Sequence, residues 1–265
     1  MIPARLLRFA AAVALASCAL SASAAEPVLF VYSTINSLLA GNYDGELSIK
    51  ELASKGNFGM GTFNHLDGEM VALDGIYYHI RADGSVSLAA PGEQLPWANV
   101  LPFQPATMIA AGRMTSGQDL KGLEARIDAT LDNRNLFYAV KIEGEFSKVV
   151  TRAIPAQTRP YQPLIAVSKT QVEFRRDQIN GTLLGIRSPA FSKAFNVPGW
   201  HWHFISQDRT YGGHALAATL VQGSIKLAKL HRVELELPQN SEFAKTDQSQ
   251  DRSTELEKIE SSGAD

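Results

Sequence analysis

The sequence predicts an α+β (mixed α/β) fold, built on mixed β-sheets with a few helices, from three observations. Short runs that alternate apolar and polar residues, such as 76–80 and 136–146, are typical of strands. Three Asp-Gly dipeptides between residues 67 and 84 are typical of the turns in a β-meander. The stretch from Asp119 to Leu131 carries apolar residues at helical spacing.

Composition and charge limit the classes of function. The chain has 265 residues, of which 45% are hydrophobic and 20% are charged, as expected of a globular protein with a sizeable core. The formal net charge of -2 gives no positive field that would hold nucleic acid. Cys18 is the sole cysteine, which excludes an internal disulfide or a thiolate metal site. Any metal site must therefore use histidines and carboxylates.

Residues 1–25 are predicted to be a signal peptide. Arg5 and Arg8 accompany an apolar run that is too short to span a bilayer, and the small residues 22–25 follow as a cleavage site. We therefore expect an exported mature protein, periplasmic or extracellular, without a membrane span. An alternative stays open, because residues 15–18 resemble a bacterial lipoprotein box in which Cys18 would carry a lipid anchor.

The elements of the N-terminal half follow from local patterns. A first strand is expected near Val28, and Asp44 is expected to cap a helix over 46–55. Ser116 and Asp119 are expected to begin the helix whose apolar residues have helical spacing up to Leu131. The remaining predicted elements are a β-meander over 59–88 and strands over 136–146 and 148–154.

The polar segment 157–163 is predicted to be a subdomain boundary. Residues 26–156 would form a β-rich N-terminal subdomain, residues 157–240 a C-terminal subdomain, and residues 241–265 a polar tail that closes on the site. Within the C-terminal part, the patterns predict a helix over 167–176, a turn at Asn180-Gly181, and strands over 183–186, 199–205 and 214–237.

Three of the six histidines fall within 14 residues. His201 and His203 alternate along an expected strand, so their imidazoles share a face, with Cα atoms roughly 7 Å apart. A loop that ends in two glycines can fold His214 back toward them. Three neutral imidazoles with a vacant fourth position are typical of catalytic zinc. The alternative is an aromatic-rich strand whose half-buried histidines bind nothing.

The other candidate residues are less distinct from the sequence alone. Glu69 opens an apolar strand, where a carboxylate faces either solvent or a site. Arg152 is a lone cation within a β-run and could either clamp a substrate carboxylate or lie at a sheet edge. Nothing intrinsic distinguishes Glu260 from the other acids of the tail. The isolated histidines are expected to be structural or exposed: His65, His79 and His231.

A series of motifs follows in order along the chain: Gly61-Thr62-Phe63-Asn64, Leu66-Asp67-Gly68-Glu69, Thr151-Arg152, Gly199–Ser206, Asp208-Arg209 and Gly212-Gly213-His214. Together they resemble the α-acetolactate decarboxylase family, from about Val31 to the tail. The resemblance implies a zinc enzyme that converts 2-acetolactate to acetoin and carbon dioxide. It also implies a homodimer of two-part chains with mixed sheets, and a zinc site in the C-terminal half.

The resemblance also implies roles for individual residues. Those that match the zinc ligands are His201, His203 and His214. Those that match the surroundings of the substrate are Thr62, Glu69 and Arg152. Thr62 and Arg152 would bind the substrate, and Arg152 would also take part in catalysis. Glu260 matches a late glutamate in the family's closing segment.

The implied reaction has a use for each of these groups. Loss of carbon dioxide leaves an electron pair that moves onto the neighbouring ketone oxygen and gives an enediolate, which zinc can stabilise as a Lewis acid. Arg152 would position the carboxylate, and Glu69 or Glu260 would deliver a proton to carbon. Beside zinc and Arg152, the ionised form of Glu69 is expected to be favoured.

Two other functions stay open at this point. One is another zinc hydrolase or lyase, in which the same three histidines serve to activate water. The other is an exported metal-binding β-protein that is not an enzyme.

Overall fold

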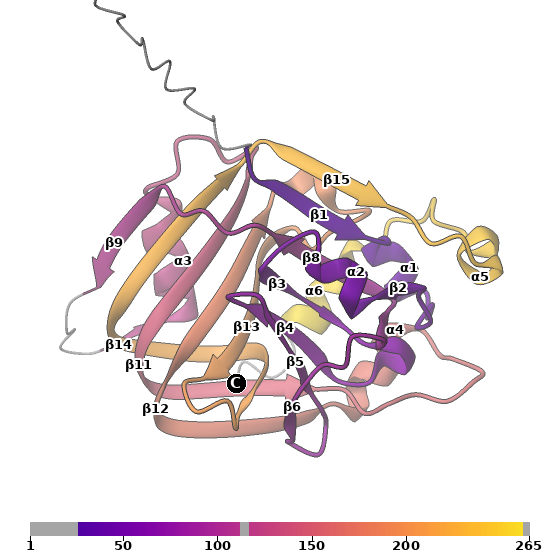
Figure 1. The fold of residues 1–265 in the computed structure, drawn as a ribbon, viewed down its shortest axis with the longest axis horizontal. Helices are drawn as coiled ribbons and strands as arrows, with labels where there is room; N and C mark the ends of the chain where they lie inside the picture. Colours follow the sequence, from indigo (N-terminus) through magenta and orange to yellow (C-terminus); the bar gives the residue numbers. More distant parts are fainter. Residues whose placement is uncertain (1–25, 112–116, 262–265) are drawn as a thin grey trace, which may run out of the picture.

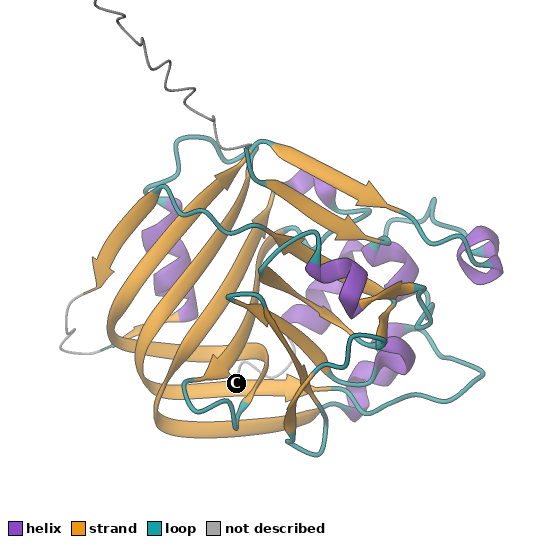
Figure 2. Ribbon diagram, in the orientation of Figure 1, coloured by secondary structure: helices purple, strands orange, loops and turns teal. Residues whose placement is uncertain are grey.

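Two β-sheets packed face to face, together with several short helices, make up the computed structural model (Figures 1 and 2). The structure describes residues 26–111 and 117–261. The predicted signal peptide, the lipid-anchor alternative at Cys18 and the expected helix start at Ser116 lie outside these residues. None of the described helices is long and apolar enough to cross a membrane. The prediction of mixed sheets with few helices is confirmed.

The first sheet has the strand order β15-β1-β8-β3-β4-β5-β6. Its strands are β1 (Val28–Tyr32), β3 (Phe58–Thr62), β4 (Glu69–Leu73), β5 (Ile76–Ile80), β6 (Val86–Leu88), β8 (Trp97–Leu101) and β15 (Arg232–Glu236). β1 is parallel to β15 and antiparallel to β8, so the sheet is mixed. β3 to β6 are successive neighbours, which confirms the predicted meander.

The second sheet has the order β10-β14-β11-β12-β13, and β9 also pairs with β14. Its strands are β9 (Thr107–Ala111), β10 (Gln118–Asp119), β11 (Phe137–Ala153), β12 (Val172–Ser188), β13 (Gly199–Ser206) and β14 (Gly212–Leu230). β13 pairs with β12 and also with the first residues of β14, so the sheet curls on itself. β11 replaces the two strands expected over 136–154, because register shifts near Phe146 keep the pairing continuous.

Three glycines on neighbouring long strands of the second sheet lie opposite one another and form a row across the sheet. Gly144 on β11 pairs with Gly181 on β12 and with Gly223 on β14. A Cβ on Gly181 would lie 2.3 Å from an atom of the Phe204 ring, so a side chain has no room there. The prediction of a turn at Asn180-Gly181 is therefore wrong, because this glycine permits close packing inside a continuous strand.

The helices are short. They are α1 (Ile35–Leu39), α2 (Ile49–Ala53), α3 (Leu120–Asp128), α4 (Leu164–Val167), α5 (Ser241–Lys245) and α6 (Ser253–Ser261), with 3-10 turns at Asn64–Leu66, Ser168–Thr170 and Ala190–Ser192. The two-residue strands β2 (Leu47–Ser48) and β7 (Gln94–Leu95) pair beside α2. The expected helix after Asp119 is confirmed as α3, since the Asp119 side chain accepts the Gly122 N–H at 2.8 Å.

Two other helix predictions need correction. The expected helix over 46–55 is shorter, because Ser48 forms a capping box with Glu51 and starts α2 at Ile49. Asp44 caps no helix there and instead binds Arg159 and Tyr161. The helix expected over 167–176 is wrong, because residues 172–176 pair with β11 as the start of β12. Main-chain pairing with a long neighbouring strand overrides the local pattern.

The main core lies between the two sheets. Leu29, Val31 and Met60 from the first sheet pack against Leu184 and Ala228 from the second, and all five are fully buried. β11 and β12, on either side of the expected boundary at 157–163, are direct neighbours in one sheet. The chain passes from the first sheet to the second between β8 and β9 instead, and it returns to the first sheet at β15.

Candidate active site

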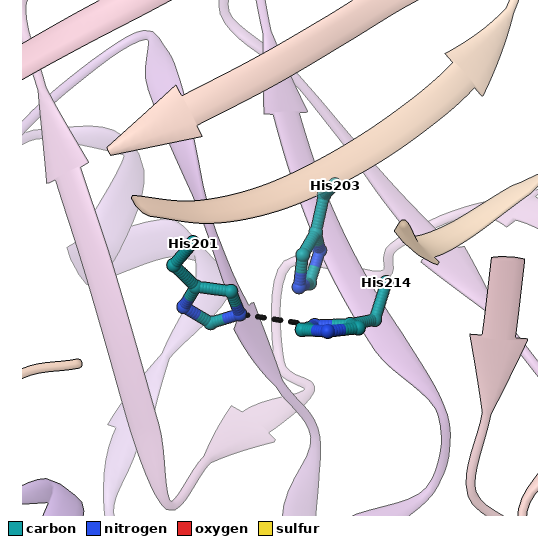
Figure 3. Close-up of side chains that lie close together, drawn as sticks. All are labelled: His201, His203 and His214. Atoms are coloured by element: carbon teal, nitrogen blue, oxygen red, sulfur yellow. Dashed lines mark hydrogen bonds between the residues drawn. The ribbon is translucent and has the colours of Figure 1, made fainter. Parts of the chain in front are cut away.

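Three buried histidines converge at the point where β13 meets β14. Alternation along β13 puts His201 and His203 on one face of the strand. His214 is the residue opposite His203 in the antiparallel ladder, so its side chain points to the same face. One nitrogen from each ring lies within 4.8 Å of the other two, and the three rings face one another in Figure 3. The sequence prediction that these three residues meet is thus confirmed.

The environment keeps the three imidazoles neutral. Burial, with a further contribution from the charge on Arg152, lowers the pKa of His201 to about 3. Burial also holds the pKa values of His203 and His214 well below 6.5. The His203 Nδ1 lies 3.1 Å from the Met70 carbonyl oxygen, which suits a donated N–H and leaves Nε2 with its lone pair. Neutral imidazoles are the form that binds metal ions.

The donor set fits a metal ion. His201 Nε2 and His214 Nδ1 lie 3.1 Å apart, joined by the dashed line in Figure 3. Within the described ranges, the Nδ1 of His201 is buried without a hydrogen-bond partner. Convergent, buried and uncharged imidazoles suit a divalent transition-metal ion.

The remaining predicted site residues line the same small cavity, of about 50 Å³. Thr62 ends β3, Glu69 begins β4, Arg152 lies on β11 and Glu260 lies on α6. Glu69 Oε2 is 3.5 Å from His203 Nε2, and Glu260 Oε2 is 3.5 Å from His214 Nε2. Residues that are far apart in the sequence are therefore brought to one point, the tail residue Glu260 included.

Both glutamates are held partly in their protonated form. Burial raises the pKa of Glu69 to about 8, although the positive charge of Arg152 opposes this. Burial likewise raises the pKa of Glu260 to about 7, again against Arg152. Without a metal ion, burial therefore raises the pKa of Glu69 more than Arg152 lowers it. This favours the protonated form, whereas the sequence led us to expect the ionised form. Glutamates with such pKa values can exchange protons near neutral pH.

Arg152 is the buried cation of the cavity. Its side chain is 4% exposed, its Nη1 donates to Gln171 Oε1 at 3.0 Å, and its Nη2 lies 3.9 Å from Glu260 Oε1. In the part of the chain that the structure describes, its Nε is buried without a hydrogen-bond partner. A buried guanidinium with unused donor capacity is suited to an anionic ligand.

Sequence reasoning missed several residues of this site. Gln171 holds the Arg152 guanidinium, and Trp97 stacks on His201 with ring centroids 5.8 Å apart. No local signal marks either residue, because each acts through a contact between distant segments. The cavity also has an apolar wall that the motifs did not indicate, which includes Leu38, Leu66, Trp97, Ile154, Leu164 and Ile259.

Comparison with known proteins supports the resemblance found in the motifs. A sequence model of the family described as alpha-acetolactate decarboxylase matches residues 29–250. The chain belongs to this family. It is 38% identical over 234 residues to the alpha-acetolactate decarboxylase of Brevibacillus brevis, covering 88% of this chain and 81% of that enzyme. It is 40% identical over 237 residues to the Methanosarcina mazei enzyme of that name, covering 89% and 81%.

Solved structures of the family have the same fold. The crystal structure of alpha-acetolactate decarboxylase from Bacillus subtilis strain 168 superposes with a TM-score of 0.85 at 34% identity, covering 88% of this chain and 99% of that one. A Staphylococcus aureus protein described as similar to alpha-acetolactate decarboxylase gives a TM-score of 0.83 at 30% identity, covering 88% of this chain and 99% of that one. The prediction that the chain is an enzyme of the carboxy-lyase class is confirmed.

Proposed function

We propose that this protein decarboxylates 2-acetolactate to acetoin and carbon dioxide in the cavity beside the three histidines. The observation that carries the proposal is that Arg152, Glu69 and Glu260 meet the histidine cluster in one small buried space. The names of the relatives support the choice of substrate. Family membership also favours this function over a water-activating zinc hydrolase and over a metal-binding protein without activity.

We propose Zn²⁺ as the cofactor. It would be held by three neutral imidazoles, those of His201, His203 and His214. When bound there, zinc supplies a Lewis acid that stabilises negative charge on the oxygens of the substrate. The donor set supports this choice, since three histidines leave a position open for substrate.

Arg152 and Thr62 are proposed to bind the substrate. The buried guanidinium would pair with the substrate carboxylate, which is the one full charge on a 2-hydroxy-3-keto acid. The Thr62 hydroxyl donates to the Gly68 carbonyl oxygen at 2.7 Å, so its lone pairs remain free to accept a hydrogen bond from a substrate hydroxyl. The apolar wall would surround the two methyl groups of acetolactate and exclude water.

Glu69 and Glu260 are proposed to handle the proton. When the bond to the carboxylate carbon breaks, its electron pair moves onto the ketone oxygen and gives an enediolate. This species must take up a proton on carbon to become acetoin. In the protein without a metal ion, burial raises the pKa values of the two carboxyl groups to about 8 and about 7, so both side chains lie in an environment that favours holding a proton. Glu69 lies beside His203 and Glu260 lies beside His214, so the two carboxyl groups can approach the substrate from different sides.

Equilibrium dialysis with zinc, followed by a colour test for acetoin, tests the function. We expect about one zinc per chain and acetoin formation from 2-acetolactate that depends on the metal. Zinc binding with turnover of esters or hydration of carbon dioxide, and without acetoin, would identify a different zinc enzyme. Zinc binding without any turnover would identify a metal-binding protein.

Export and self-association are proposed on the sequence and on the family resemblance. We propose that residues 1–25 are removed on export to the periplasm or medium, with a lipid anchor at Cys18 as the alternative. Mass spectrometry of the mature N-terminus distinguishes a free residue near Glu26 from a lipid-bearing Cys18. We also propose a homodimer, which light scattering on the purified protein tests.

A further inference from the structure

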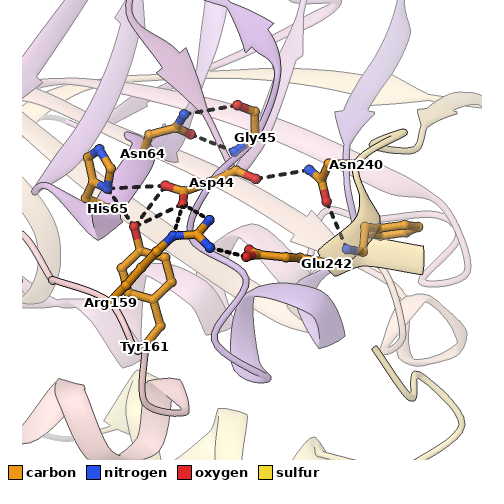
Figure 4. A network of polar contacts seen from close by, with 9 residues as sticks. Asp44, Gly45, Asn64, His65, Arg159, Tyr161, Asn240 and Glu242 are labelled. Carbon is orange, nitrogen blue, oxygen red and sulfur yellow. Dashed lines mark hydrogen bonds and ion pairs between the residues drawn. The ribbon is translucent and has the colours of Figure 1, made fainter. Parts of the chain in front are cut away.

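A polar cluster on the outside of the molecule joins segments that enter the site. The Asp44 cluster consists of Asp44, His65, Arg159, Tyr161 and Glu242 (Figure 4). The Asp44 carboxylate accepts hydrogen bonds from Arg159 Nε at 3.2 Å and from the Tyr161 hydroxyl at 2.9 Å. Arg159 also pairs with Glu242, and His65 Nδ1 lies 3.2 Å from Asp44 Oδ1. The Asp44 carboxylate thus contacts side chains from two other parts of the chain, and Arg159 links it to a third part through Glu242.

Two of these parts lead directly to substrate-side residues. His65 lies in the loop between Thr62 and Glu69, where its own φ is 65°. Main-chain bonds fix it further, because its N–H donates to the Tyr43 carbonyl and its carbonyl accepts the Gln157 N–H, both at 2.7 Å. Arg159 and Tyr161 belong to the loop that leaves β11 after Arg152. The cluster therefore joins the chain segments beside Glu69 and Arg152.

The third part is the tail. Asn240 Nδ2 donates to the main-chain oxygen of Asp44 at 3.1 Å, close to the pair that Arg159 forms with Glu242. Farther along, Asn42 Nδ2 donates to Thr246 Oγ1 at 2.6 Å. The tail then reaches α6, whose Leu256 and Ile259 are 4% and 2% exposed. Those two residues seat the helix over the cavity and bring Glu260 to His214 and Arg152.

We propose that Asp44 is a positioning residue for the reaction, acting through the tail to keep Glu260 at its place beside Arg152 and His214. The proposal rests on the proposed function, because it concerns how the proton-carrying glutamate is held. The contacts suit this role, since Asp44 holds the tail by its main chain and, through Arg159, by its side chain. Burial and the nearby Asp44 charge raise the pKa of Tyr161 to about 12, so its hydroxyl keeps the proton that it donates.

The size of the expected effect follows from the exposure of the cluster. Arg159 has 58% of its side chain exposed, so its ion pairs add little to overall stability. Reaction rates are more sensitive than stability, because a shift of about 1 Å in a catalytic group can cost on the order of 10²-fold. A change at Asp44 should therefore lower turnover far more than it lowers the melting temperature.

The test is Asp44→Asn, which keeps the shape but turns one acceptor oxygen into an amide donor. We expect kcat for acetolactate to fall about tenfold, with KM, bound zinc and melting temperature nearly unchanged. Hydrogen exchange of residues 253–260 should become faster. In a Glu260→Gln background, Asp44→Asn should cause no additional loss of kcat, because the two residues act in series.

The matched control is Asp177→Asn on β12. It breaks an exposed ion pair with Arg175, whose two atoms lie 2.9 Å apart, and it should leave kcat and the hydrogen exchange of α6 unchanged.

Several results would overturn the proposal. Normal kcat and normal exchange of α6 in Asp44→Asn would show that the tail needs no such anchor. Loss of zinc, or a large fall in melting temperature, would show a general structural role instead. A further loss in the Glu260→Gln background would show that Asp44 acts elsewhere. If the unaltered enzyme forms no acetoin, the proposed function fails, while the exchange of α6 in the variant still decides whether Asp44 anchors the tail.

Discussion

Arg152 on β11 and His214 on β14 are direct partners in the antiparallel ladder of the second sheet. Opposite residues of a sheet share a face, so the guanidinium and the imidazole enter the same cavity. His214 is in turn the partner of His203 on β13. The ladder thereby fixes the distance between the Arg152 guanidinium and the imidazole nitrogens of the histidine cluster. It also explains why the charge of Arg152 contributes to the lowered pKa of His214.

Replacing His203 should remove the metal. The His203→Ala variant loses one of three converging nitrogens, and two imidazoles hold zinc much more weakly than three. We expect zinc content to fall from about one per chain to below about a tenth, together with activity. Metal analysis after dialysis measures this, with His231→Ala as the control because His231 lies outside the cluster. Full activity of exhaustively chelated protein in metal-free buffer would refute the zinc requirement.

Replacing Glu69 should affect turnover and leave the metal in place. Glu69→Gln keeps the size of the side chain beside His203 but removes its exchangeable proton. We expect kcat to fall about 10²-fold or more, the range for loss of a general acid–base group, while zinc content and fold persist. Steady-state kinetics with acetolactate measure the change. Near-normal kinetics would assign proton delivery to Glu260 or to water.

The tail should be needed for turnover. Truncation after Asn240 removes Glu260 together with the helix that covers the cavity, so turnover should be abolished while zinc remains bound. Because the truncation also uncovers the neighbours of Leu256 and Ile259, Glu260→Gln is the cleaner variant. We expect it to lower kcat about 10²-fold with an unchanged melting temperature. An active truncated enzyme would exclude any role for the tail.

The metal-free protein should be most stable at about pH 6.5. Below about pH 6.5, the three histidines take up protons in the unfolded state but stay neutral in the folded state, where they are buried. Stability is therefore lost as the pH falls toward the folded-state pKa of His201, about 3. Above about 4.5, Glu69 and Glu260 keep protons in the folded state that they release on unfolding. Their contribution is therefore lost as the pH rises through about 7 to 8.

Between these limits the two effects oppose each other. Three histidines outweigh two glutamates, so net stability should rise slightly up to about pH 6.5 and then decline. Melting temperatures of dialysed protein from pH 4 to 9 measure the profile. The histidine arm is checked in the His203→Ala variant, which should lose less stability in acid. A melting temperature that rises steadily from pH 6.5 to 8.5 would contradict the expected role of the buried glutamates.

Local patterns predicted the meander, α3 and the meeting of three histidines. Each of these depends on neighbouring residues, such as the alternation of His201 and His203 or the cap at Asp119. Glu260 was placed by its family resemblance, since no local feature separates it from other acids of the tail. The structure puts it in the cavity because Leu256 and Ile259 seat α6 there.

Other features depended on partners that the local sequence does not reveal. Residues 172–176 form a strand only because β11 extends far enough to pair with them. Gly181 follows an asparagine, a pattern typical of turns. In the fold it lies within a strand, and the absence of a side chain leaves room for the Phe204 ring. Gln171 and Trp97 belong to the site through contacts across the sheets, and neither has a distinctive neighbourhood. The spacing of apolar residues indicates which face of a helix or strand is buried, but it does not indicate which residues pack against that face.

The pairing of β1 with β15 has a consequence for the order in which the molecule can assemble. Val28 lies opposite Arg232, so the N-terminal strand gains its outer neighbour only after more than 200 further residues have been synthesised. Contacts of such large sequence separation slow folding, and incomplete chains expose an unpaired strand edge. A nascent chain would thus lack this pairing until residues 232–236 have been synthesised. With the role proposed for Glu260, catalytic competence comes later still, because α6 follows β15 in the chain.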